Sequence, residues 1–586
     1  MVIFGYGLLV FLRVQAVHKS YGSYNGCLDC LDLAVVASDL RPLAAVLVLI
    51  AGAWIISIKF IRISLAFLAV AIVFAYAVDL GIFLLLGHRL RVLDFFRYAG
   101  ETHAAWTVAA PLLKSPQGIA LLVGFIISSC SLIFIILSAR RSWRVALMTL
   151  LLAIIFASAI KLIPDPGYVI AIAYQDVLTN NKPRGVNVTY SEKTLSNLNN
   201  QSPHTQQCIS GATKNKSVIL IVVESLSLYH SKLQSGIMDA TPGLDALAQE
   251  NSYLSEFHAN GFTTDGGLIS LLTGHVPLPS VGRYESMQAY TGFEKPQHEA
   301  FQRLEKRGYG TQFFTTGNLG FLGKGKWLSG LGFSHVEGSE NPFYAKLPRG
   351  GFDEAGDHAL YKRYLQWYDS ERKTEENFSA LLTVTTHPPF LIPGTDKMDE
   401  LSAFRYADQE VSDFVRELKK RNYFEDGIVI IMGDHRSMTP RRKGEWELLN
   451  EGAVSRVPAI VIGSSGLPHG PTPGRWQQTD FLPSLLYMAG LNSCTNNFQG
   501  RFLGDTRTPA QFVLHAQGAQ PDRVTVWEKY RKTAGQIELN GDNTRWIEGG
   551  PSDETEKITI NFINSERATR AALPADFLPL LMRGKK

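Results

Sequence analysis

Long apolar runs fill the first 163 residues of the chain and then stop. A helix needs roughly 20 apolar residues to cross a bilayer, because an unpaired backbone cannot face lipid. Four segments reach or approach this length, at residues 43–58, 63–87, 118–138 and 144–162. Val2–Val17 is a shorter fifth candidate that contains Arg13. The pattern therefore predicts an α-helical transmembrane domain of about five helices over residues 1–163.

Basic residues beside these runs predict the orientation of the chain. Lys- and Arg-rich loops stay in the cytoplasm, and the Arg140–Arg144 cluster separates the last two runs. Everything after residue 163 is therefore expected on the outer side. Arg89 and Arg91 fall in a loop that this orientation also places outside. An interfacial helix over Arg91–Lys114, with its basic residues at lipid phosphates, would explain them.

One acidic residue, Asp79, lies inside the 63–87 run. A carboxylate at membrane depth is a functional candidate. It can also be a group that faces other helices or lies near the interface. The sequence leaves both interpretations open.

The pattern changes after residue 163. Residues 164–211 contain four prolines and a polar run, which predicts a linker with short helices on the membrane surface. Over residues 212–586, short apolar runs alternate with helical periods. This alternation predicts an α/β domain with a mostly parallel central sheet, followed by a C-terminal extension. The expected strands are Ser217–Val223, Gly310–Thr315, Phe378–Thr385, Gly427–Met432 and Pro458–Ile462, and the clearest helices are Thr241–Asn251 and Ala403–Lys420.

Polar side chains follow three of the expected strands. Glu224 comes directly after SVILIVV, His387 follows FSALLTVTT, and Asp434 and His435 follow GIVIIMG. Ligands of such sheets bind at the carboxyl ends of the strands, so these side chains are expected to converge. Two carboxylates and one imidazole suit Mn²⁺, Zn²⁺ or Mg²⁺. The sequence thus predicts a metal site built from Glu224, Asp434 and His435.

The segment Gly261–Gly274 (GFTTDGGLISLLTG) offers a reacting group for this site. Thr263 and Thr264 precede a helical stretch, and the amides and dipole of a helix N-terminus favour anions. A catalytic metal site keeps one position for a water or a reacting group. Simple N-capping is the alternative role for either threonine.

Composition narrows the partners and the chemistry. The net charge is +4, from 57 Lys+Arg against 53 Asp+Glu, and no basic stripe is interleaved with aromatic residues. Nucleic acid is therefore not an expected partner. Cys27 and Cys30 form a C-x-x-C without the βαβ context of a thioredoxin-like site. Cys208 and Cys494 could pair if the domain lies in an oxidising compartment.

Four motifs occur in a fixed order: VVESLS, TPGLDALAQENSYLSEFHANGFTTDGGLISLLTG, TTHPPF and IMGDH. In order and spacing they resemble the alkaline-phosphatase-like superfamily over about residues 215–500. Within it they resemble the sulfatase-like membrane transferases of the lipoteichoic acid synthase and phosphoglycerol transferase type. That resemblance implies an enzyme of the bacterial cytoplasmic membrane, multi-pass, with residues 212–586 as an extracytoplasmic catalytic domain.

The resemblance also implies roles for single residues. The metal ligands fall on Glu224, Asp434 and His435, around one divalent ion for which manganese is expected and magnesium or zinc is an alternative. The threonine nucleophile falls on Thr263, which also contacts the metal, with Thr264 as the close alternative. The substrate-side histidine, which is also a catalytic candidate, falls on His387.

The segment Thr315–Phe333 resembles the family stretch that grips the head group. The substrate-binding candidates are Thr264, Lys324, Lys326, Trp327 and His387. Thr316 stands where the family carries a histidine, and Lys324, Lys326 and Trp327 replace a Trp-x-Arg pattern. This departure leaves the identity of the head group open.

The implied reaction moves a phosphoglycerol or similar head group from a phospholipid donor to a cell-envelope glycan through a phosphothreonine. Phosphoethanolamine transfer, and hydrolysis with water as the acceptor, are the alternatives. Sulfate-ester hydrolysis is not expected, because TTDGGL lacks the cysteine or serine that sulfatases carry there. A scaffold protein with an inactive fold would have lost a ligand or the nucleophile, whereas all these positions are filled.

Overall fold

The computed structural model describes residues 2–21, 28–86, 89–90, 106, 109–110, 112–159, 190–199, 208–212, 216–279, 289–290, 292–293, 300–439, 441–463, 466–494, 499–503, 512–516, 522–528, 533–550 and 553–571. The chain forms two compact units. One comprises residues 1–183 with 439–443, and the other comprises residues 184–438 with 444–586.

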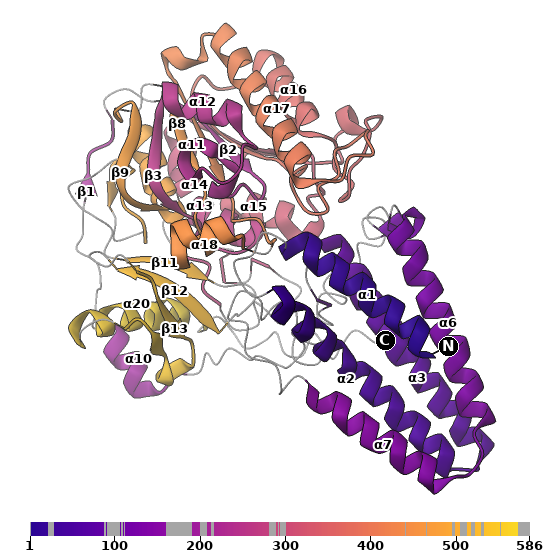
Figure 1. Ribbon diagram of the computed structural model, residues 1–586. Helices are drawn as coiled ribbons and strands as arrows, with labels where there is room; N and C mark the ends of the chain where they lie inside the picture. Colours follow the sequence, from indigo (N-terminus) through magenta and orange to yellow (C-terminus); the bar gives the residue numbers. More distant parts are fainter. Residues whose placement is uncertain are drawn as a thin grey trace, which may run out of the picture. The chain divides into compact units, whose positions relative to one another are not determined.

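The N-terminal unit is built from apolar helices that run alongside one another (Figure 1). Three of the described helices are long and apolar enough to cross a membrane, through Val35–Ile55, Lys59–Leu85 and Pro116–Ser138. Two further apolar stretches, Phe4–Val17 and Trp143–Ser158, are shorter. The helices are α1 (Val2–Tyr21), α2 (Leu28–Ile55), α3 (Lys59–Leu86), α6 (Pro116–Ser138) and α7 (Trp143–Ser158). Membrane crossing by α1 and α7, and the orientation, remain predictions, and most of Arg91–Lys114 lies outside the described residues.

An arginine–aspartate cluster, formed by Arg13, Asp39, Asp79 and Arg89, lies inside this helical unit. All four residues are at most 2% exposed. Asp39 Oδ1 lies 2.8 Å from Arg89 Nη2, and Asp39 Oδ2 lies 3.3 Å from Arg13 Nε. Asp79 forms ion pairs with both arginines. Each carboxylate therefore meets both guanidinium groups, and the four charges sum to zero.

This cluster answers two questions that the sequence left open. Asp79 faces basic residues of α1 and of the segment after α3, so its charge is neutralised within the helical unit. Arg89 is paired in the same way, and Leu90 N–H donates to Asp79 Oδ1 at 2.8 Å. Arg89 is thus not the unpaired surface charge that sets topology. Its position does not argue against the predicted orientation.

The central sheet of the second unit has eight strands in the order β5-β4-β6-β2-β7-β8-β3-β9. All run in the same direction except β8, which is antiparallel to both of its neighbours. The predicted α/β class with a mostly parallel sheet is confirmed. The strands are β2 (Ser217–Val223), β3 (Ser252–His258), β4 (Gly310–Thr315), β5 (His335–Glu337), β6 (Asn377–Leu382), β7 (Gly427–Gly433), β8 (Ala459–Ile462) and β9 (Gly470–Gln477).

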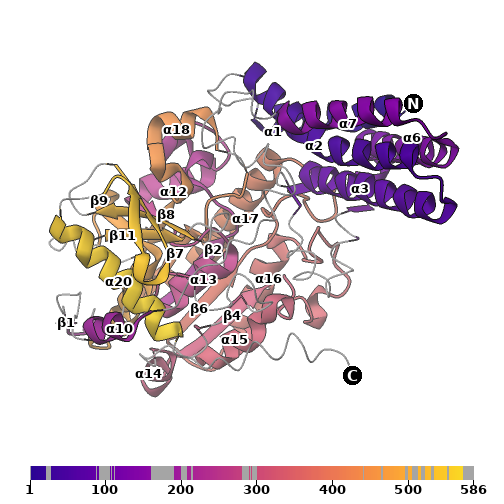
Figure 2. The same ribbon diagram turned by 90° about the horizontal axis from the view of Figure 1, so that it is seen from below.

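Helices cover both faces of this sheet, because its central strands are apolar on both sides. In β2, Val218, Leu220 and Val222 face one core, while Ile219 and Ile221 face the other. The first core is covered by α13 (Thr264–Thr273), α14 (Ala300–Lys306), α15 (Lys324–Leu331) and α19 (Phe481–Met488). The second is covered by α12 (Pro242–Glu250), α16 (Asp357–Ser370) and α17 (Glu400–Lys420), as Figures 1 and 2 show.

A smaller antiparallel sheet forms the C-terminal part of this unit. It consists of β11 (Phe512–Ala516), β12 (Arg523–Glu528), β13 (Gly535–Glu538) and β14 (Arg545–Glu548), with α20 (Asp553–Ala571) beside it. The predicted linker contributes α10 (Glu192–Asn199), which lies next to α20 in Figure 1. Tyr190 OH, just before α10, donates to Asn564 Oδ1 at 3.2 Å. This helix therefore packs on the C-terminal part of the second unit.

Two short strands bring the cysteines of the second unit together along the backbone. β1 (Cys208–Ile209) pairs antiparallel with β10 (Ser493–Cys494), and Cys208 lies directly opposite Cys494. Opposed residues of an antiparallel pair have Cα atoms roughly 4.5–5.5 Å apart, within the range of a disulfide. Cys27 lies outside the described residues.

Candidate functional site

Glu224 lies at the carboxyl end of β2, and its backbone is fixed by two threonines. Its N–H donates to Thr383 Oγ1 at 3.0 Å, and its carbonyl accepts from Thr386 Oγ1 at 2.6 Å. Ser225 follows with a φ of 57°, so the chain turns sharply after the carboxylate. Ser225 Oγ donates to Glu224 Oε1 at 2.8 Å. The carboxylate is thus held in one orientation at the edge of the sheet.

Asp434 and His435 follow β7, the parallel neighbour of β2, with Gly433 opposite Val223. Asp434 Oδ1 accepts the backbone N–H groups of Ser225 and His435, each at 2.7 Å. His435 Nδ1 lies 2.8 Å from the carbonyl of Arg436, which can only accept, so Nδ1 carries the hydrogen. The lone pair of the neutral ring is then on Nε2, as a metal-ligating histidine requires.

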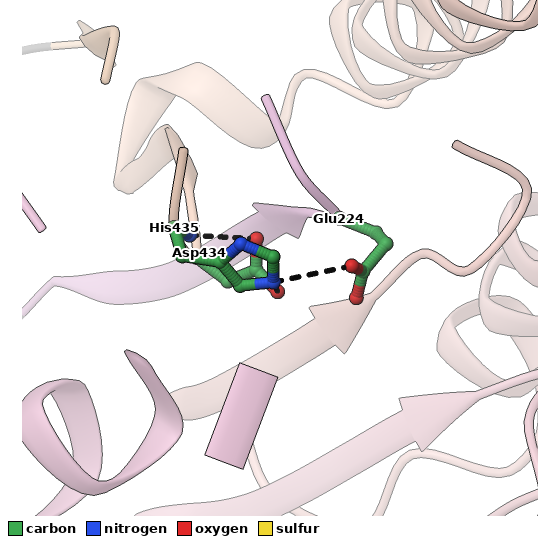
Figure 3. A group of neighbouring side chains, drawn as sticks. All are labelled: Glu224, Asp434 and His435. Atoms are coloured by element: carbon green, nitrogen blue, oxygen red, sulfur yellow. Dashed lines mark hydrogen bonds and ion pairs between the residues drawn. The ribbon is translucent and has the colours of Figure 1, made fainter. Parts of the chain in front are cut away.

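The ligand atoms of Glu224, Asp434 and His435 all lie within 4.8 Å of one another (Figure 3). His435 Nε2 is 3.3 Å from both Glu224 Oε1 and Asp434 Oδ2. Asp434 Oδ2 and His435 Nε2 are buried and make no hydrogen bond. Buried polar atoms are rarely left without a partner. A divalent cation between them would satisfy both, so the three residues fit the metal role that the sequence predicted for them.

The electrostatics of this trio agree with a site built for a cation. Burial raises the pKa of Asp434 well above its usual range, and the charge of Glu224 raises it further. Burial also opposes ionisation of Glu224, but the adjacent imidazole of His435 outweighs it and lowers the pKa of Glu224. For His435, burial disfavours the imidazolium, yet the two carboxylates raise its pKa to about 9. The carboxylates therefore attract positive charge to this point, and a metal ion would compete with a proton for it.

Both candidate threonines lie at the N-terminus of α13, and one of them contacts Glu224. Thr263 is the N-cap residue, but its side chain makes no capping hydrogen bond. Thr264 Oγ1 donates to Glu224 Oε2 at 2.9 Å. Capping therefore does not account for either hydroxyl. The direct contact to a predicted ligand is made by Thr264, while the role of Thr263 as nucleophile stays a prediction.

The first turn of α13 packs on the backbone that follows β7, at the predicted ligand Asp434. A Cβ added to Gly267 would lie 2.3 Å from the carbonyl oxygen of Asp434. Real Cβ atoms do not approach so closely, so a side chain at this position would push the helix away from the strand end. The glycine keeps the threonines close to Asp434.

His387 lies in the turn after β6, where the charges of Glu224 and His435 act on it. Its Nδ1 is 2.6 Å from the carbonyl of Pro388, and the ring of Phe352 meets it edge-on at 4.2 Å. Burial lowers the pKa of His387, while the charge of Glu224 raises it. With Nδ1 directed at a carbonyl, the neutral imidazole carries its lone pair on Nε2, which suits proton transfer to or from an oxygen in the site.

The three predicted residues of α15 have different surroundings. Lys324 is buried, and burial lowers its pKa while the carboxylates of Glu224, Asp265 and Asp434 raise it. Lys326 is exposed. Residues two apart on a helix point to different sides, which explains why only Lys324 joins the acidic groups of the site.

Trp327 does not fit its predicted role in gripping the head group. Its side chain is 5% exposed, its indole N–H donates to the carbonyl of Phe293 at 2.9 Å, and its ring stacks on Tyr290 at 4.1 Å. The sequence could not show which face of α15 turns inward. The indole belongs to the core beneath the site.

Sequence reasoning missed the residues that support the ligands from behind. Thr383 and Thr386 hold the backbone of Glu224, and Gln478 Nε2 donates to the carbonyl of Asp434 at 2.6 Å. Thr386 lies inside the TTHPPF motif, from which the sequence predicts a role for His387 alone. Gln478 lies in no motif.

Comparisons with known proteins agree with this geometry. Residues 216–491 match the family model described as Sulfatase. The chain is 21% identical over 317 residues to a lipoteichoic acid synthase of Staphylococcus saprophyticus subsp. saprophyticus, covering 48% of this chain and 46% of that protein. It is 24% identical over 246 residues to phosphoglycerol transferase I of Escherichia coli, covering 38% of this chain and 31% of that protein. The chain thus spans less than half the length of either relative.

The fold has a match among solved structures. A protein in the alkaline phosphatase superfamily from Vibrio parahaemolyticus superposes with a TM-score of 0.50 at 19% identity, over 65% of this chain and 96% of that one. Residues 216–491 are therefore similar to the sulfatase family, and the second unit has an alkaline-phosphatase-like fold. The resemblance predicted from the four motifs is confirmed.

Proposed function

We propose that this protein is a metal-dependent phosphotransferase of the cytoplasmic membrane. It moves a phosphoglycerol or similar head group from a phospholipid to a cell-envelope glycan through a phosphothreonine. The observation that carries the proposal is the convergence of Glu224, Asp434 and His435 with a threonine hydroxyl 2.9 Å from Glu224. The names of the two relatives, lipoteichoic acid synthase and phosphoglycerol transferase I, support the choice of head group.

Glu224, Asp434 and His435 would hold one divalent ion, for which we propose manganese with magnesium or zinc as alternatives. Such an ion, when bound, lowers the pKa of a nearby hydroxyl and neutralises charge on phosphoryl oxygens. The donor set of two carboxylates and one imidazole suits all three metals.

The residues of the chain then divide the reaction between them. In the first half, the Thr263 oxygen forms a bond to the phosphorus of the lipid head group, and the bond from phosphorus to the diacylglycerol oxygen breaks. The Thr263 hydroxyl releases its proton to solvent, and His387, after taking up one proton from solvent, delivers it to the departing diacylglycerol oxygen, so that protons balance. In the second half, a glycan hydroxyl attacks the same phosphorus and the threonine is restored. Lys324 would place its ammonium against the phosphate.

The apolar helices of the N-terminal unit support a lipid donor. A catalytic domain tethered beside the bilayer meets phospholipid head groups at high local concentration. With the catalytic domain outside the cytoplasm, envelope glycans are accessible to it as acceptors.

Mass spectrometry of the intact full-length protein tests this function directly. We expect a covalent adduct after incubation with manganese and phosphatidylglycerol vesicles, and none with Thr263→Ala. Phosphatidylethanolamine vesicles, in a parallel arm, identify the alternative head group by the adduct mass. The absence of any adduct in both arms, with metal bound, would contradict the phosphothreonine.

Thr264→Ala is the matched control, because its hydroxyl contacts Glu224 directly. Retention of the adduct in Thr263→Ala and its loss in Thr264→Ala would move the nucleophile by one residue. Labelled glycerol separates the possible acceptors: label on glycan supports transfer, and label free in solution supports hydrolysis.

A further inference from the structure

A network of buried amide side chains lies directly behind the candidate site. It consists of Asn260, Gln477 and Gln478, which are at most 3% exposed. An amide can donate and accept at once, so it can join main-chain segments that expose different groups. The network joins the end of β7, the threonine segment and β11, and the first two of these lead to residues of the site.

Gln478 connects the metal-ligand strand with the threonine segment. Its Nε2 donates to the carbonyl of Asp434 at 2.6 Å and to that of Gly433 at 3.0 Å. Its Oε1 accepts the backbone N–H of Asn260 at 3.0 Å. Asn260 precedes Thr263 by three residues. One side chain thereby spans the two halves of the site.

Asn260 extends the network into the C-terminal sheet. Its Nδ2 donates to Gln477 Oε1 at 2.8 Å and to the carbonyl of Leu514 at 2.7 Å, and its Oδ1 accepts from Thr479 N at 3.1 Å. Its carbonyl accepts from Ala516 N at 2.8 Å. Leu514 and Ala516 belong to β11. The first strand of the smaller sheet is therefore hydrogen-bonded to the segment that presents the threonines.

We propose that Gln478 and Asn260 are positioning residues that fix the distance between the threonines of α13 and the metal ligands after β7, with β11 as their support. The role rests on the proposed function, because that function identifies the two halves as one active site. Gly267 packs so closely against the Asp434 carbonyl that even a Cβ atom would not fit between the two segments. Loss of the amide bonds would therefore displace the backbone of Asp434 or of the threonine segment.

The C-terminal sheet lies outside residues 216–491, which match the Sulfatase model. In this proposal the hydrogen bonds from β11 to Asn260 support the segment that leads to Thr263 and Thr264. Gln478 and Asn260 are the points through which this support reaches the site.

Full-length Gln478→Met in detergent tests the proposal. Methionine keeps the volume but removes three hydrogen bonds. We expect the affinity for manganese, measured by titration calorimetry, to fall about 10- to 100-fold, as for other residues that orient metal ligands. We expect kcat to fall about 100-fold with KM for the phospholipid nearly unchanged, because misplacement acts on the reacting geometry. Gln409→Met, the same change at an exposed position of α17, should match the wild type.

Asn260→Asp is the second variant, and it places an oxygen against two acceptors, Gln477 Oε1 and the Leu514 carbonyl. It should show the same loss of manganese affinity. A purely structural role would lower the unfolding midpoint while the folded fraction kept wild-type metal affinity and kcat, and that result would overturn the proposal. If the wild type binds metal but transfers no head group, the proposed function fails, while the metal affinities of the variants still decide the role of Gln478.

Discussion

Two buried groups of ionisable side chains, one in each unit, are assembled in opposite ways. In the arginine–aspartate cluster, each carboxylate meets both guanidinium groups and the charges sum to zero. In the trio of Glu224, Asp434 and His435, two carboxylates face one imidazole, and two of the ligand atoms lack a hydrogen bond. The charges of the first group balance, whereas the second group has more carboxylates than basic groups, an excess that a cation would balance.

The difference shows how charge balance separates a structural cluster from a reactive one. Burial alone does not distinguish them, because every one of these residues is at most 3% exposed. A neutral set of charges in an apolar bundle holds helices together and has no need of a further ion. An unbalanced set stores unfavourable interactions that a ligand relieves.

Asp434→Asn should break the second cluster with the largest effect. The amide oxygen keeps the two hydrogen bonds that Oδ1 accepts, while one carboxylate charge is lost. We expect head-group transfer to fall at least about 10³-fold. The rise in unfolding midpoint that manganese gives the wild type should also disappear, because that rise depends on binding to the folded state.

The unfolding midpoint without metal is the sharper measurement on this variant. Removing one of two buried like charges relieves repulsion, so Asp434→Asn is expected to unfold at the same or a higher temperature than the wild type. A marked decrease in the metal-free midpoint would show that the trio is complete without a cation.

Asp79→Asn should destabilise the protein by unbalancing the arginine–aspartate cluster, whereas Asp434→Asn should not. Loss of one carboxylate leaves two arginines with one aspartate inside the helical unit, at a cost of about 3–5 kcal/mol. The unfolding midpoint in detergent measures this loss, and manganese should not restore it. The double variant Asp79→Asn with Arg13→Gln leaves one balanced pair and should be the more stable of the two. Reduced turnover in fully folded Asp79→Asn would assign the cluster a part in catalysis instead.

Lys324 and Lys326 sharpen the comparison within one helix. Lys324→Met removes a cation that faces Glu224, Asp265 and Asp434, so transfer should fall on the order of 10²-fold. Lys326→Met changes an exposed side chain and should leave transfer nearly unchanged. Steady-state rates with the same vesicles compare the two. Equal losses would contradict the separation that the helix geometry gives them.

We expect the smallest effect from a disulfide between Cys208 and Cys494. Its presence or absence tests whether the second unit lies in an oxidising compartment. The backbone register already places the two residues opposite each other. Pairing outside the cytoplasm should link their peptides in a non-reducing digest and add about 2–4 kcal/mol to stability. Free thiols at both positions in protein from intact cells would argue for a reducing compartment.

The sequence predicted the strands that are apolar throughout, and missed those that are not. Ser217–Val223 and Gly427–Gly433 are buried at nearly every position, and their uninterrupted runs mark them. Ser252–His258 mixes buried positions with half-buried polar ones, and Gly470–Gln477 contains two prolines and two glycines, so neither segment shows an uninterrupted apolar run. The strand β8 was predicted, but its antiparallel direction follows from the chain path.

Candidate site residues at strand ends could be predicted from the sequence, whereas those that depend on tertiary contacts could not. Residues placed by a strand end, such as Glu224 and Asp434, came together as predicted, because a parallel register fixes them. Trp327 depended on the rotation of a helix, and Gln478 on a partner 44 residues away in the chain, neither of which leaves a local pattern. Arg13 lies within an apolar run, and its acidic partners come from other helices, so no local pattern predicts its ion pairs.

Gly267 sets a limit on how this site can vary in sequence. With a Cβ 2.3 Å from the Asp434 carbonyl, all nineteen alternatives carry the same clash, so size and polarity of the substituent do not matter. Saturation of this codon should therefore give a single functional residue, whereas Lys326, whose side chain is exposed, should accept many substitutions. The spacing between the threonine segment and the Asp434 backbone thus depends on the absence of any side chain at position 267.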